Sequence, residues 1–113
     1  MDNLNFVRVG ASVLELKVAD TIFNVSEIKK QIDKALESKI DILVFPELCI
    51  SGYTCADLFH QDTLINETYK AVKDLLDYSI NKDITFIVGS LIKLDNSLFN
   101  IAIVIINKIV KII

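Results

Sequence analysis

Residues that interrupt regular structure are scarce in this 113-residue chain, which has one proline, three glycines and no tryptophan. So little proline and glycine excludes collagen-like repeats and loop-rich linkers, and a hydrophobic share of 52% excludes intrinsic disorder. Two cysteines are too few for a disulfide-dense secreted scaffold. The length suffices for one domain with its own core and is too short for two.

Positive charge is also in short supply. Twelve basic residues, of which Arg8 is the only arginine, face fifteen acidic ones, and the net charge is -3. The basic residues are scattered, so nothing favours nucleic acid or an anionic membrane as a partner. The longest apolar run, residues 101–106, is too short to cross a bilayer, and residues 1–3 do not resemble a signal peptide. Cys49 and Cys55 fit neither a redox C-x-x-C pair nor half of a zinc site, so we expect a reducing, cytoplasmic location.

Apolar periodicity predicts alternating strands and helices. One amphipathic helix is expected over residues 24–38, with Asn24 and Glu27 as a capping box. A second begins at Asp62 or Thr63 and presents one apolar face: Ile65, Tyr69, Val72, Leu76 and Ile80. Strands are predicted over residues 6–14, 40–45, 84–92, 98–106 and 109–113.

The resulting order is β-α-β-α-β-β-β, which is an α/β fold whose first two strands run parallel. Turns at Asp95-Asn96 and Asn107-Lys108 predict two hairpins. Residues 101–106 are apolar at odd and even positions alike, so we expect that strand to be covered on both faces. Because the chain stops inside an apolar strand, we interpret residues 1–113 as the front part of a longer, truncated domain.

Residues 40–59 attract attention because an acid, Glu47, follows directly on a buried strand and Pro46. Open α/β proteins place working groups at the carboxyl ends of their strands. The ordinary alternative is a loop carboxylate paired with a lysine or a backbone N–H. The apolar neighbours Phe45, Leu48 and Ile50 are expected to desolvate Glu47.

Other reactive side chains have simpler explanations. Cys49 and Cys55 lack a basic partner and are expected to be structural. His60 has no partner at metal-ligand spacing, and Asp57 is expected to cap a helix. Gly52 is expected to adopt a backbone conformation with positive φ. Lys108 and Lys111 are expected to be solvated.

The sequence F-P-E-L-C-I-S-G-Y-T-C-A-D-L-F at residues 45–59 resembles the carbon–nitrogen hydrolase (nitrilase) superfamily. More narrowly, it is similar to the amino-terminal glutaminase domains of the glutamine-dependent NAD+ synthetase family. Residues 7–11, 17–20, 88–90 and 100–106 also fit, so the likeness extends over nearly the whole chain. The resemblance implies an α-β-β-α sandwich, of which this chain supplies the first half.

The resemblance also implies a glutamate–lysine–cysteine catalytic set for glutamine amide hydrolysis. Glu47 matches the glutamate and would act as general base, and Tyr53 matches a tyrosine that lines the glutamine pocket. From the residues alone, Tyr53 is as well explained by packing with its hydroxyl bonded to backbone. The lysine and cysteine of the set would lie beyond Ile113, so the fragment by itself is expected to be inactive.

In the complete protein, the ammonia released would amidate nicotinic acid adenine dinucleotide in a separate, absent synthetase domain that uses ATP and Mg2+. This chain itself is expected to hold no cofactor and no metal, and the complete protein is expected to be a homo-oligomer. Two alternatives stay open: another nitrilase-type amidase or carbamoylase, and a non-catalytic α/β module used in assembly.

Overall fold

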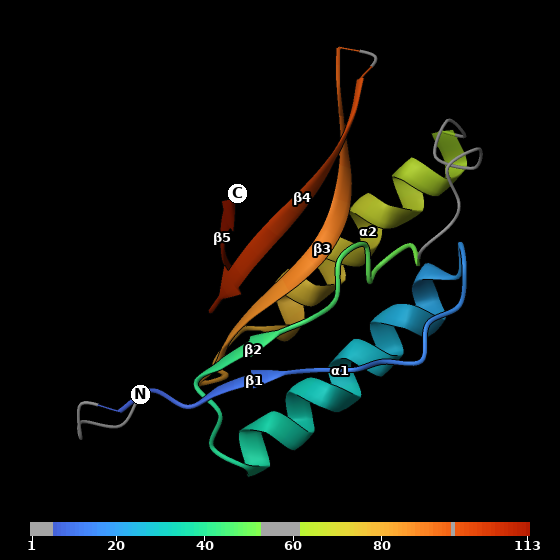
Figure 1. Cartoon of the computed structure of the whole chain (residues 1–113). Helices are drawn as coiled ribbons and strands as arrows, with labels where there is room; N and C mark the ends of the chain where they lie inside the picture. The colour runs from blue at the N-terminus through green and yellow to red at the C-terminus, as the bar shows by residue number, and fades with distance from the viewer. Residues whose placement is uncertain (1–5, 53–61, 96) are drawn as a thin grey trace.

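The computed structural model describes residues 6–52, 62–95 and 97–113, and it has the predicted element order (Figure 1). Its two helices are α1 (Thr21–Glu37) and α2 (Asp62–Tyr78). The strands are β1 (Val9–Ala11), β2 (Ile42–Val44), β3 (Thr85–Leu94), β4 (Ser97–Ile106) and β5 (Ile109–Ile112). They form one sheet in the order β1-β2-β3-β4-β5, which confirms the α/β prediction.

The sheet is mixed. β1, β2 and β3 pair in parallel, and β3, β4 and β5 pair antiparallel. Each parallel connection passes through a helix, and a right-handed crossover is the strongly favoured geometry for such a connection. The two crossovers proceed in the same direction across the sheet, so α1 and α2 lie on the same face of it (Figure 1).

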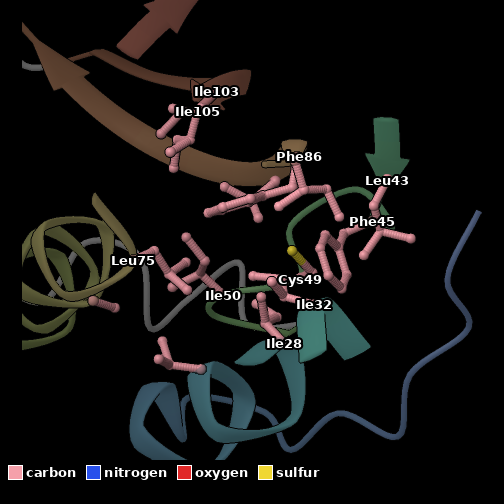
Figure 2. Close-up of a cluster of buried hydrophobic side chains, with 14 of the residues drawn as sticks. Ile28, Ile32, Leu43, Phe45, Cys49, Ile50, Leu75, Phe86, Ile103 and Ile105 are labelled. Atoms are coloured by element: carbon pink, nitrogen blue, oxygen red, sulfur yellow. The ribbon is translucent and has the colours of Figure 1, made fainter. Parts of the chain in front are cut away.

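The core lies between this helical layer and the sheet, where side chains from α1, α2, β2, β3, β4 and the adjoining loops meet (Figure 2). Fully buried side chains of this size each contribute roughly 1.5–3 kcal/mol of burial free energy. The largest ones packed here are Ile28, Ile32, Ile50, Leu75, Phe86, Val88 and Ile105.

The opposite face of the sheet is apolar too, and we call it the open face: Val9, Ile42, Val44, Ile87, Val104, Ile106 and Ile109. The described residues do not bury it. In β4, Ile103 and Ile105 are buried under the helices, whereas Ile106 is 42% exposed. The prediction that residues 101–106 are covered on both faces is therefore wrong within the described part of the chain. The reason is that both helices lie on one face.

The start of α1 differs from the prediction. Asp20, and not Asn24, is the N-cap, and its Oδ1 accepts a hydrogen bond from the Phe23 N–H at 3.0 Å. The N-cap therefore lies four residues earlier than the capping-box interpretation of Asn24 and Glu27 required. Asn24 lies inside the helix and is fully buried, because its amide is engaged by two neighbouring loops.

The buried face of α2 is rotated relative to the predicted one. Tyr69 and Ile80 are each 41% exposed, and the helix ends at Tyr78. The Tyr69 hydroxyl accepts a hydrogen bond from the Lys93 N–H at 3.1 Å, so this ring lies at the rim of β3 and not in the core. The buried residues of α2 are Leu64, Ile65, Thr68, Ala71 and Leu75, and Val72 and Leu76 of the predicted face are partly buried against the core.

Strand boundaries agree less well at the N-terminal end than at the C-terminal end. Of residues 6–14, only Val9–Ala11 form β1, and Val13 is exposed. Both predicted hairpins are present, since β3 pairs with β4 and β4 with β5. Asn107 and Lys108 have φ values of 43° and 65°, as the tight turn between twisted strands requires. Neither described helix has the length and apolar character needed to span a membrane.

Candidate active site

Glu47 lies where the sequence predicted an acid, just beyond the carboxyl end of β2 and after Pro46. Its Oε1 accepts a hydrogen bond from Nδ2 of Asn100 in β4. Among the residues that the structure describes, Asn100 is the only hydrogen-bond partner of the Glu47 side chain. The carboxylate is thus not tied into an ordinary surface ion pair with a described lysine.

The expected apolar enclosure of Glu47 is wrong for the described residues, because its side chain is exposed. Phe45 and Ile50 are buried in the core beneath the helices (Figure 2). Leu48 is half-buried and packs against a small separate cluster with Leu64 and Leu91. Leu48 adopts a φ of 53°, a left-handed conformation that is uncommon outside glycine.

The backbone of Glu47 and Leu48 packs directly against Gly89 of β3. A Cβ atom at this position would lie 2.3 Å from the backbone nitrogen of Leu48 and 3.0 Å from Cα of Glu47. Real Cβ atoms do not approach backbone so closely, so only glycine lets the loop lie against the strand. The Gly89 Cβ direction is opposite to that of Val88, a core residue under the helices, which puts Glu47 on the open-face side of the sheet.

The side chain of Asn24, in α1, forms hydrogen bonds to the loop that carries Glu47 and to the loop before α1. Its Oδ1 accepts from the Lys17 N–H at 2.8 Å, and its Nδ2 donates to the carbonyl oxygens of Lys17 (2.8 Å) and Ile50 (2.9 Å). Gly52 completes the approach with a φ of 82°, as predicted, and a Cβ there would lie 3.1 Å from the Lys17 carbonyl oxygen. One buried amide therefore joins α1, the loop before it and the loop that carries Glu47.

Replacing Asn24 with alanine is expected to lower the free energy of unfolding by about 2–4 kcal/mol, because the buried Ile50 carbonyl and the partly buried Lys17 backbone groups lose their partners. Asp20→Ala, which removes only the exposed N-cap, is the control and is expected to cost about 1 kcal/mol. Urea unfolding of the two variants measures the difference. Equal costs would show that the buried amide does not fasten the loop.

Cys49 is fully buried, which confirms the structural interpretation of this thiol. Its Sγ donates to the Gly89 carbonyl oxygen at 3.8 Å. Burial raises the pKa of the Cys49 thiol to about 11, so the thiol stays protonated at neutral pH. A protonated, enclosed sulfur is a poor nucleophile, and Cys49 is therefore not a candidate for the attack on a substrate.

Alkylation by iodoacetamide at pH 8 is expected to be at least about 100-fold slower at Cys49 in the folded protein than in urea, because both the thiolate fraction and access are reduced. Peptide mass spectrometry follows the labelling at this position. The raised pKa also makes the free energy of unfolding depend on pH. The contribution of the protonated Cys49 thiol is fully present below pH 9.0, the ordinary pKa of a cysteine, and is lost as the pH rises through about 11. Fast labelling of the folded protein would contradict the assignment.

Some of the other residues singled out from the sequence lie outside the described part of the chain. Tyr53, Cys55, Asp57 and His60 lie outside the described residues. Lys108 and Lys111 are exposed, as predicted. Within the described ranges, no group of three or more His, Cys, Asp or Glu side chains is arranged to hold a metal ion.

A cavity of about 420 Å³ opens between α1 and α2, but it is separate from Glu47. Its charged rim is already paired: Lys29 bonds Asp74 at 2.9 Å, and Lys70 bonds Glu67 at 3.4 Å. Buried Val25 and Ala71 line it as well. This cavity is a groove between packed helices and contributes nothing to the chemistry at the end of β2.

The family model for carbon–nitrogen hydrolases matches residues 8–109. The chain belongs to this family. A curated relative, the glutamine-dependent NAD(+) synthetase of Aquifex aeolicus, is 37% identical over 76 residues, which cover 67% of this chain and 13% of that protein. The corresponding enzyme of Mycobacterium leprae is 26% identical over 100 residues, or 88% of this chain and 15% of that protein.

Solved structures confirm that the chain has the nitrilase fold and covers part of it. A glutamine-dependent NAD(+) synthetase from Cytophaga hutchinsonii superimposes with a TM-score of 0.80 at 30% identity, over 93% of this chain and 18% of that one. An amidase from Nesterenkonia sp. superimposes with a TM-score of 0.79 at 16% identity, over 93% of this chain and 40% of that one. This carbon–nitrogen hydrolase chain thus spans less than a fifth of its synthetase relatives.

Sequence reasoning missed the roles of Asn100 and Asn24, although each carried a signal. Asn100 interrupts an otherwise apolar strand, and asparagine is depleted in strands. Asn24 lies at a position of the amphipathic pattern that faces the core, where an unpaired amide would be costly. A polar residue on a buried or strand-central position of this hydrolase fold requires a specific partner, and in both cases the partner is the loop around Glu47.

Proposed function

We propose that this chain is the first part of a glutaminase domain in a glutamine-dependent NAD+ synthetase, and that Glu47 is its general base. The observation that carries the proposal is the place of Glu47, just after the inner parallel strand β2 of a carbon–nitrogen hydrolase fold, with one carboxylate oxygen bonded to Asn100. The similarity to synthetases over most of the chain supports glutamine as the substrate.

In the proposed reaction, Glu47 takes the proton of a cysteine thiol, and the thiolate attacks the amide carbon of glutamine. A lysine stabilises the oxyanion of the tetrahedral intermediate. The amide nitrogen leaves as ammonia with the proton that Glu47 returns, and a thioester remains. Glu47 then takes a proton from water, whose attack releases glutamate and restores the thiol. The lysine and the cysteine would come from sequence after Ile113, and Tyr53 would line the glutamine pocket.

The open face of the sheet supports the sandwich architecture of this proposal. Val44, Val104 and Ile106 form part of an apolar surface that a second sheet, supplied by the rest of the domain, would cover. That second layer would also enclose Glu47, which is exposed to solvent on the same side. ATP and Mg2+ would bind in the separate synthetase domain, where the ammonia is used, and the complete protein would assemble as a homo-oligomer.

The experiment that tests the proposal is to express the complete reading frame and compare glutamine with ammonia as nitrogen sources for NAD+ formation from nicotinic acid adenine dinucleotide. Both are expected to support the reaction, and glutamine consumption should match NAD+ formation. A reading frame without a downstream lysine and cysteine, or without an ATP-binding domain, would overturn the assignment. In the second case, the amidase-like fold neighbours make hydrolysis of another amide the next reaction to assay.

A further inference from the structure

Asn100 is placed to control the direction of the Glu47 carboxylate, although 53 residues separate the two in sequence. Its Nδ2 donates to Oε1 of Glu47, so this donor holds one of the two carboxylate oxygens. An exposed glutamate on a loop ordinarily samples several rotamers. A single strong hydrogen bond to a charged acceptor restricts that sampling.

Asn100, the donor, and Glu47, the acceptor, are both held in place by contacts with β3. Asn100 pairs with Leu91 in a continuous antiparallel ladder, and two residues further along β4 Ala102 pairs with Gly89. Gly89 in turn carries the backbone of Glu47 and Leu48 in close contact. Because the amide and the carboxylate are anchored to neighbouring residues of one strand, their separation is determined by the sheet and not by the loop alone.

Asn100 has little to do for the stability of the core. Its side chain is exposed, and its neighbours Phe99 and Ile101 occupy the alternate face of the strand. An exposed hydrogen bond adds only about 0.5–1.5 kcal/mol to stability. The position therefore makes better sense as a means of orienting Glu47 than as a structural contact.

We propose that Asn100 is a positioning residue that turns one oxygen of the Glu47 carboxylate toward the thiol of the nucleophilic cysteine by binding the other oxygen. This inference rests on the proposed role of Glu47 as general base. The asparagine touches neither substrate nor nucleophile and acts only through Glu47. Misdirection of a base by about 1 Å can cost about 100-fold in rate, so the effect is large for a residue outside the reacting set.

The order of two substitutions distinguishes positioning from a structural role. Asn100→Ala removes the donor and lets Glu47 rotate, and kcat for glutamine is expected to fall about 10–100-fold with little change in KM. Asn100→Asp keeps the shape of the side chain but sets a second carboxylate against Glu47. It is expected to be the harsher change, by about tenfold more in kcat, because like charges in contact repel. A structural role predicts the reverse order, since aspartate preserves the volume.

The measurement uses the complete protein, with ammonia-dependent NAD+ formation to normalise each variant for folding and Ser97→Ala, an exposed change on the same strand, as the matched control. Ser97→Ala is expected to behave like the parent. Equal kcat values for Asn100→Ala and Ser97→Ala, or a milder Asn100→Asp, would overturn the positioning role. If Glu47→Gln also leaves glutamine use intact, the proposed function itself fails. If Glu47→Gln abolishes glutamine use but the Asn100 variants do not behave as expected, only the proposed role of Asn100 is wrong.

Discussion

Replacing Glu47 with glutamine is expected to lower kcat/KM for glutamine by about 10²–10⁴-fold in the complete protein, because the amide cannot accept the thiol proton. The substitution keeps the size of the side chain, and the amide oxygen of glutamine can still accept the bond from Asn100. The loss therefore reports on proton transfer and not on the shape of the site. Steady-state release of glutamate from glutamine measures it.

Ammonia-dependent NAD+ formation is the internal control for Glu47→Gln, since ammonia enters after the step that Glu47 is proposed to catalyse. It is expected to continue at the parent rate. Glu37→Gln, at the last position of α1 and away from the candidate site, provides the matched change of an acid to its amide. If the Glu47 variant consumed glutamine as fast as the Glu37 variant, the assignment of the base would be wrong.

Gly89→Ala is expected to have the second large effect, on structure and activity together. The new Cβ would stand 2.3 Å from the Leu48 nitrogen and 2.9 Å from the Glu47 carbonyl carbon, and both belong to backbone that cannot step aside. The loop must lift from β3, at an expected cost of about 3 kcal/mol in the free energy of unfolding. Glutamine-dependent kcat should fall at least about 100-fold, because Glu47 moves with the loop.

Gly10→Ala separates this clash from the general effect of adding a methyl group to a strand glycine. The nearest atom to a Cβ at Gly10 is the terminal Cδ1 of Ile40, at 2.9 Å, and a side-chain end can rotate away. The expected destabilisation is less than about 1 kcal/mol. Chemical unfolding and glutamine kinetics of the two variants give the comparison. If Gly89→Ala were as mild as Gly10→Ala, the loop would not be held against β3.

Much of the fold could be predicted from local pattern. The apolar run before Pro46, the helical spacing of Val25, Ile28 and Ile32, and the Asn107-Lys108 turn each locate an element within a few residues of where it lies. Such signals are local, because they depend on backbone preferences and on which side of an element is buried. The predictions that were wrong concern positions whose environment is set by residues distant in sequence, such as Asn24 and the buried face of α2.

The sequence by itself determined the α/β order, the family and the place of Glu47 after β2, because those depend on short motifs and on the periodicity of burial. Only the tertiary structure decided which side chains support Glu47. Gly89 and Asn100 come from strands that follow it by some 40 to 50 residues, and Asn24 comes from the helix before it. The physical reason is that close approach and hydrogen bonding depend on distances across the sheet, which no local pattern in a single sequence specifies.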